Sequence, residues 1–124
     1  MKYLKLFENF NAFNPEDISD LFLEIADKFD IPEMTSEEIM NKTIDESIDK
    51  YYNIFKNIHG DYVIDVKCGI DNVSNFLKEL EKFKLRLEKF DMYTIIHDYP
   101  NAPDNFKVGI SNSPESKTIK EALL

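Results

Sequence analysis

An apolar stripe with the spacing of an α-helix runs from Val73 to Phe90 and constrains the fold more than any other feature. At about 100° per residue its members share one side of a helix, while charged residues and Leu85 lie elsewhere. Such a helix needs an apolar surface to cover, so we expect a sheet beside it, with Asp71 or Asn72 as the helix cap. The stripe consists of Val73, Phe76, Leu80, Phe83, Leu87 and Phe90.

Segments typical of β-strands lie on both sides of this helix. Residues 92–99 are dense in Tyr, Thr and Ile, and residues 106–111 place alternate apolar side chains on one side. Residues 100–105 contain two prolines and two asparagines and predict a loop between these strands. Before the helix, residues 61–68 alternate, with one side formed by Tyr62, Ile64, Val66 and Cys68.

Residues 51–58 are ambiguous between helix and strand. Their apolar residues continue the helical spacing of the preceding segment, but the segment is rich in β-formers and precedes His59-Gly60. We favour a β-hairpin in which these two residues form the turn. A two-residue turn would place Phe55 opposite Ile64 on an apolar face of the sheet.

The N-terminal half predicts two helices and holds nearly all of the net charge. Residues 1–50 contain five lysines against thirteen Asp and Glu, and so carry −8 of the formal charge of −9. Pro15 follows a capping asparagine and precedes acidic residues, which is typical of a helix start. Residues 30–33 interrupt this helix, and Thr35 with Glu38 forms the capping-box pattern that opens the second helix. The expected apolar edge of that second helix is Met40, Ile44 and Ile48.

The acidic residues of the first helix gather on one side, opposite its apolar face, with Leu23 among them. Three interpretations are open: a solvated helix face, a docking face for a basic partner, and a divalent-metal site. The third lacks a loop that would bring the carboxylates together on one ion. The residues are Glu16, Asp17, Asp20, Glu24 and Asp27.

Composition narrows the classes of partner and compartment. An isoelectric point near 4.7 argues against direct binding to nucleic acid or to an anionic membrane surface. The single cysteine, Cys68, forms no internal disulfide and agrees with a reducing compartment. No apolar run has the length of a membrane span, and the start of the chain lacks a secretory signal. We therefore expect a cytoplasmic protein.

No pattern of catalytic or metal-binding residues emerges. His97 and Tyr99 share one side of a predicted strand, while Asp98 points to the other, so they form no relay by themselves. They are candidates for a small-ligand site or an active site, with an ordinary sheet histidine as the alternative. Cys68 is expected to be a small buried hydrophobe, and His59 a turn residue. We predict no cofactor and no metal.

An aromatic arm precedes the first helix and is a second candidate for partner binding. It contains Phe7, Phe10 and Phe13, and packing on its own core is the alternative. The segment Met1-Lys2-Tyr3-Leu4-Lys5-Leu6-Phe7-Glu8-Asn9-Phe10 resembles the opening of many small uncharacterised proteins of large tailed bacteriophages. The Asn-, Ile-, Lys- and Phe-rich composition is similar to that of such genomes. The resemblance implies an accessory or minor virion role, in the virion or the host cytoplasm, and supplies no catalytic residues.

The sequence therefore predicts an α+β protein: two N-terminal helices, then a β-β-α-β-β unit whose small antiparallel sheet carries helices on one face. Residues 1–14 form the arm, 15–111 a single domain, and 112–124 a flexible or short helical tail. The leading functional hypothesis is a non-enzymatic module that binds another protein or itself. The alternatives are an acidic inhibitor that mimics nucleic acid towards a basic host protein, and a ligand binder or enzyme built around His97.

Overall fold

The computed structural model describes residues 15–45, 48–113, 115 and 116 and has the predicted order of elements. Two helices come first, a hairpin and a helix follow, and a second hairpin ends the order, which confirms the α+β class. The elements are α2 (Pro15–Lys28), α3 (Ser36–Asp45), β1 (Tyr51–Lys56), β2 (Tyr62–Lys67), η1 (Ile70–Asn72), α4 (Val73–Glu88), β3 (Tyr93–Tyr99) and β4 (Ala102–Ser111).

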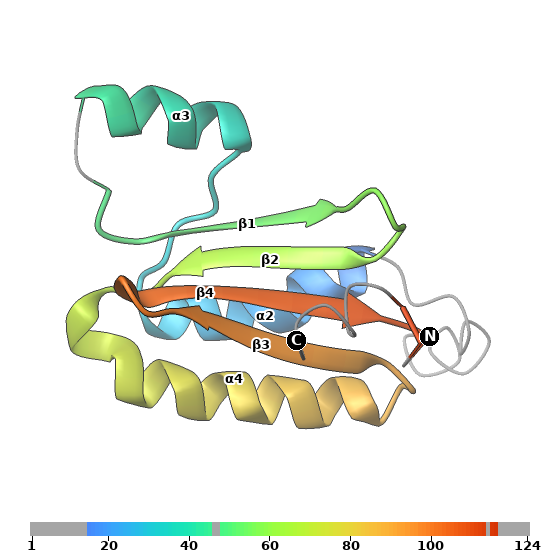
Figure 1. Ribbon diagram of the computed structural model, residues 1–124. Helices are drawn as coiled ribbons and strands as arrows, with labels where there is room; N and C mark the ends of the chain where they lie inside the picture. The colour runs from blue at the N-terminus through green and yellow to red at the C-terminus, as the bar shows by residue number, and fades with distance from the viewer. Residues whose placement is uncertain (1–14, 46–47, 114, 117–124) are drawn as a thin grey trace.

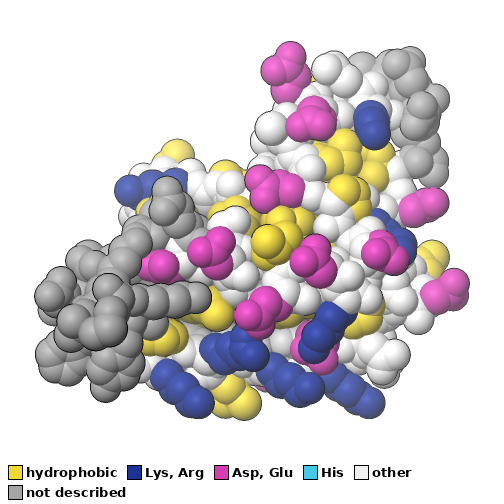
Figure 2. Space-filling model, turned by 180° about the vertical axis from the view of Figure 1, so that it is seen from behind, with side chains coloured by type: hydrophobic (Ala, Val, Ile, Leu, Met, Phe, Trp, Pro, Cys, Tyr) yellow, Lys and Arg dark blue, Asp and Glu magenta, His cyan; other side chains and the backbone are white. Residues whose placement is uncertain are grey.

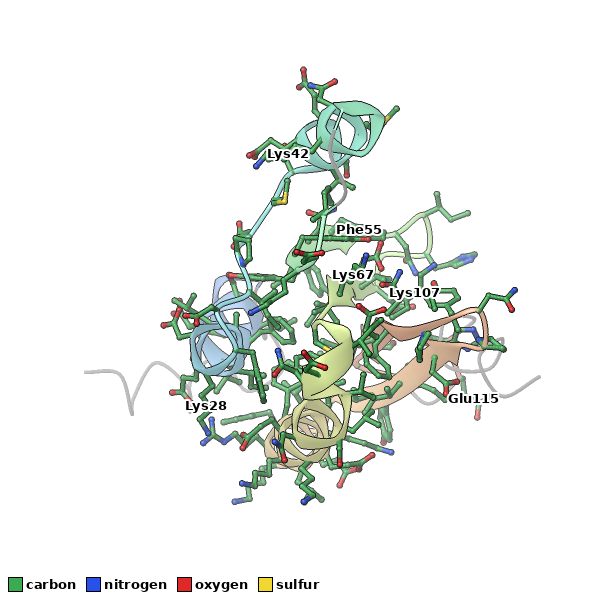
Figure 3. All side chains as sticks on the ribbon, turned by 90° about the vertical axis from the view of Figure 1, so that its left-hand side faces the viewer. Lys28, Lys42, Phe55, Lys67, Lys107 and Glu115 are labelled. Atoms are coloured by element: carbon green, nitrogen blue, oxygen red, sulfur yellow. The ribbon has the colours of Figure 1, made fainter. Side chains whose placement is uncertain are left out.

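The four strands form one antiparallel sheet in the order β1-β2-β4-β3 (Figure 1). Because β2 and β3 both run antiparallel to β4, they are parallel to each other, and α4 makes the crossover between them. Helices α2 and α4 lie on one face of the sheet, so the other face carries no helix among the described elements (Figures 1 and 3). We call this second face the open face.

Aromatic rings join the two helices to the sheet. Phe22 of α2 is fully buried, with its ring centroid 5.1 Å from Tyr52 on β1 and 5.6 Å from Phe83 on α4. On the same side of the sheet, Phe76 of α4 lies 5.8 Å from Phe106 on β4. The predicted stripe of α4 supplies the buried helix face, namely Phe76, Leu80, Phe83 and Leu87.

The hairpin of β1 and β2 is confirmed, but its predicted register is wrong by one residue. Phe55 pairs with Val63 and not with Ile64. The loop has three residues between Asn57 and Asp61, and Gly60 adopts a positive φ of 83° at its end. The Asn57 side-chain oxygen accepts hydrogen bonds from the backbone N–H groups of His59 and Asp61, which fixes this longer loop.

A one-residue shift turns every side chain of a strand to the other face of the sheet. Tyr52 and Ile54 therefore pack on the core, and Phe55 lies on the open face with 39% of its surface exposed.

Two further expectations about local structure are wrong. Strand β4 begins at Ala102, within the predicted loop, because Tyr99 pairs with Ala102 across a turn of two residues. A register irregularity lies next to this turn, between Asp98 and Tyr99. Asn72 does not cap α4 through its side chain, which instead donates a hydrogen bond to the Cys68 carbonyl at 2.9 Å. The short helix η1 leads directly into α4 instead.

Helix α3 stands away from the layered body (Figure 1). Its predicted capping box is present: Thr35 Oγ1 accepts from the Glu38 backbone N–H at 3.1 Å, and the Glu38 carboxylate accepts from the Thr35 N–H at 3.2 Å. None of its described residues belongs to the buried core. Met40, predicted on its apolar edge, has 68% of its surface exposed.

Phe22 should therefore dominate the stability of the body. We expect Phe22→Ala to lower the free energy of unfolding by about 3–5 kcal/mol, because it removes the ring that both Tyr52 and Phe83 contact. Leu23→Ala, one position along the same helix but 44% exposed, should change it by less than about 0.5 kcal/mol. Chemical denaturation measures both, and equal effects would contradict this packing.

Candidate functional site

A groove lies beneath α3, and its walls come from α3 and from the segments immediately before and after it. It encloses about 260 Å³, and hydrophobic side chains are visible between α3 and the body in Figure 2. We call it the α3 groove. Its described lining is Asp30, Pro32, Met34, Lys42, Ile48, Asp49 and Lys50.

The segment before α3 is held against the sheet edge, and this positions the groove. The Tyr52 backbone N–H donates to the Pro32 carbonyl, and the Met34 N–H donates to the Tyr52 carbonyl, each at 2.9 Å. The Tyr52 hydroxyl also donates to the Glu33 carboxylate at 3.0 Å. Burial first, and then the hydrogen bond and negative charge of Glu33, raise the pKa of Tyr52 to about 12. This phenol therefore stays protonated and keeps its hydrogen bond throughout the neutral range.

The acidic side of α2 is mostly exposed, as predicted, but it is not an unpaired array of carboxylates. Arg86 of α4 donates to the Glu24 carboxylate at 2.6 Å, and Lys28 of α2 contacts Glu79 of α4 at 3.2 Å. These pairs reduce the field that α2 presents to a basic partner, although exposed pairs contribute little stability. Asp20, Glu24 and Asp27 are exposed and Asp17 is half-buried.

Two groups of predicted partner-binding residues lie beyond what can be described. Glu16 belongs to α2, but its side chain is outside the described set. The aromatic arm, with Phe7, Phe10 and Phe13, lies outside the described residues and stays a prediction.

His97 and Tyr99 lie on the open face, away from the helices. Their rings meet edge to face with centroids 5.4 Å apart, and His97 is exposed. Lys107 on β4 is the cross-strand neighbour of His97 on one side and of Asp65 on the other. The strands therefore bring a histidine, a lysine, a carboxylate and a tyrosine onto one surface.

A pocket of about 340 Å³ opens beside Tyr99 and Asp65 on this face. Burial raises the pKa of Asp65, and the positive charge of Lys107 opposes that rise. The pKa of Tyr51, on the adjoining strand, is raised by burial and then by the charges of Asp65 and Tyr99. The pocket is lined by Asp65, Tyr99, Pro100, Asn101, Ala102 and Asn105.

Cys68 is fully buried on the core side, as expected for a small hydrophobe. Its thiol donates to the Gly69 carbonyl at 3.5 Å, and burial raises its pKa to about 11. His59 lies in the hairpin loop and is exposed. Neither residue contacts a described partner with which it could form a nucleophile and base pair.

The parts of the chain that the structure describes contain no group of three or more His, Cys, Asp or Glu side chains placed to hold a metal ion. Within the same ranges, no helix has both the length and the apolar character that crossing a bilayer requires. Comparisons of the chain with protein-family models, with curated proteins and with solved structures found no match.

Two sets of residues with a role in these surfaces escaped the sequence analysis. Met34 lines the α3 groove but belongs to no periodic pattern, and Ile48, expected on the apolar edge of the second helix, lies beyond the end of α3 at Asp45 and lines the groove instead. Asp65 interrupts an otherwise apolar strand, and this lone carboxylate was the available signal for the open-face pocket. Asn105 lies in the segment predicted as a loop, so its place on a strand could not be anticipated.

The environment of Cys68 leads to a test of its chemical inertness. In native protein at pH 8 we expect alkylation by iodoacetamide to be at least about a hundredfold slower than in denatured protein, because the thiolate is both rare and inaccessible. Mass spectrometry of the modified fraction over time measures the ratio. Comparable rates in the two states would show that the thiol is exposed and reactive.

Proposed function

We propose that this protein is a non-enzymatic module that binds another protein through the α3 groove and the acidic side of α2. The observation that carries the proposal is the position of α3, which lines the groove with Lys42, exposes Met40 and packs no described residue into the core. The resemblance of the N-terminal residues to tailed-phage proteins supports an accessory or minor virion role for such a module, in the virion or the host cytoplasm.

The physical argument starts from the length of α3. A helix of ten residues is shorter than the roughly 12–15 residues at which isolated helices become even marginally stable in water. Helices in proteins gain most of their stability by burying an apolar face, and none of the described side chains of α3 belongs to the buried core. A partner that filled the groove and contacted α3 would cover the half-buried Ile48 and the exposed Met40, and would extend the apolar contact of the helix.

The charge around the groove indicates what the partner carries. Asp30 and Asp49 balance Lys42 and Lys50 within the groove itself. The neighbouring α2 adds exposed carboxylates, so the wider surface is acidic. We therefore propose a partner segment with apolar side chains for the groove and basic residues beside them. The acidic-inhibitor hypothesis relies on the carboxylates of α2 alone. It has less support, because the contact of Arg86 with Glu24 offsets part of that negative charge.

A capture experiment with matched variants tests the proposal. We expect Met40→Glu to abolish retention of the protein captured by the immobilised wild-type chain from its native lysate, because it places a charge in the apolar contact. Ile58→Glu is the control, since Ile58 is 95% exposed at the tip of the hairpin loop. Asp20→Asn with Glu24→Gln should weaken retention and reduce its dependence on salt.

Quantitative immunoblotting of the captured protein compares the variants, with circular dichroism to show that each is folded. Equal retention by wild type, Met40→Glu and Ile58→Glu would remove the α3 groove from the binding surface. A wild-type chain that stays monomeric and retains no protein would contradict the proposed function itself.

A further inference from the structure

A second surface, independent of the α3 groove, carries polar groups that lack partners. The Asp65 carboxylate is half-buried on the open face, and no described side chain makes an ion pair or hydrogen bond with it. The Asn105 Oδ1 is buried and accepts no hydrogen bond from the described residues. Both residues line the 340 Å³ pocket, and of the two the half-buried Asp65 carboxylate is the acceptor that a ligand in the pocket can reach.

We propose that this pocket binds an organic cation of the guanidinium class. The Asp65 carboxylate would accept two parallel N–H bonds from the planar group. Tyr99 lines the same pocket and offers an aromatic ring for the flat face of the cation, while Pro100 and Ala102 provide apolar walls. A neutral ligand of the same shape leaves the carboxylate unpaired.

The register of the strands explains why Lys107 does not already satisfy the pocket. Lys107 is the direct cross-strand neighbour of Asp65, and its charge lowers the pKa of that carboxyl, yet no ion pair joins the two side chains. Lys107 is exposed, so its ammonium group remains hydrated. A bound guanidinium would compete with this charge, and removal of the lysine should therefore strengthen ligand binding.

Two kinds of ligand could present a guanidinium group to the pocket: a free small molecule and an arginine side chain of a polypeptide. Propylguanidinium chloride is the probe for the cation itself, and propylurea is its neutral counterpart of the same shape. A capped Gly-Arg-Gly peptide presents the same group on a backbone. Binding of both cations assigns the pocket to an arginine side chain, and binding of propylguanidinium alone assigns it to a small molecule.

Amide NMR titration of the isotope-labelled full chain measures binding. We expect saturable shifts at Asp65, Tyr99 and the Asn105 side-chain amide with propylguanidinium, and none with propylurea. Asp65→Asn should weaken binding by at least about tenfold, since it removes the charge from the hydrogen bonds. Lys107→Gln should strengthen it by a few fold, because it removes a competing charge.

Three results would overturn the proposal: no saturable shift with propylguanidinium, equal shifts with propylurea, or Asp65→Asn binding as tightly as wild type. Because Lys107 is exposed, the Lys107→Gln variant keeps the test decisive even where Asp65→Asn fails to fold. Met40→Glu should leave the titration unchanged, since Met40 belongs to α3 and not to the open face. The result of this titration is therefore independent of whether the α3 groove binds a protein partner.

Discussion

The contact of Phe22 with Tyr52 and Phe83 holds the architecture together, because it is where α2, the edge strand and α4 meet. Tyr52 also fixes the segment before α3. Its backbone forms hydrogen bonds with that segment, and its hydroxyl donates to the Glu33 carboxylate. The core on one face of the sheet therefore sets the geometry of the α3 groove on the outside. Because α2 and α4 both lie on that face, the polar and aromatic side chains of the 340 Å³ pocket lie on the opposite one.

Much of this fold follows from periodicity. The stripe of α4 is long and regular, so it predicted both the helix and its buried side correctly. The capping box at Thr35 and the helix start at Pro15 are local signals, and the two hydrogen bonds between Thr35 and Glu38 bear out the first of them. Strand β2 alternates clearly, which also predicted its core side correctly, including the buried Cys68.

The features that the sequence did not predict depend on side-chain and inter-strand contacts that periodicity does not show. A two-residue and a three-residue loop are equally compatible with His59-Gly60, and the side chain of Asn57 decides between them. Strand β4 continues into a proline-containing segment because strands on both sides supply hydrogen-bonding partners. The apolar edge of α3 was predicted, but periodicity cannot show whether a helix face meets its own core. For the same reason the sequence placed His97 and Tyr99 on one face without revealing Asp65 and Asn105 beside Tyr99.

The central claim is that the described part of α3 contributes no residue to the buried core and that α3 therefore opens independently of it. Native-state amide hydrogen exchange tests this residue by residue. The account predicts that amides of α3 exchange through local opening at a small free-energy cost, while those of β2, β4 and α4 exchange only on global unfolding. Equal protection of the amides of α3 and α4 would contradict the claim, because α3 would then unfold together with the core.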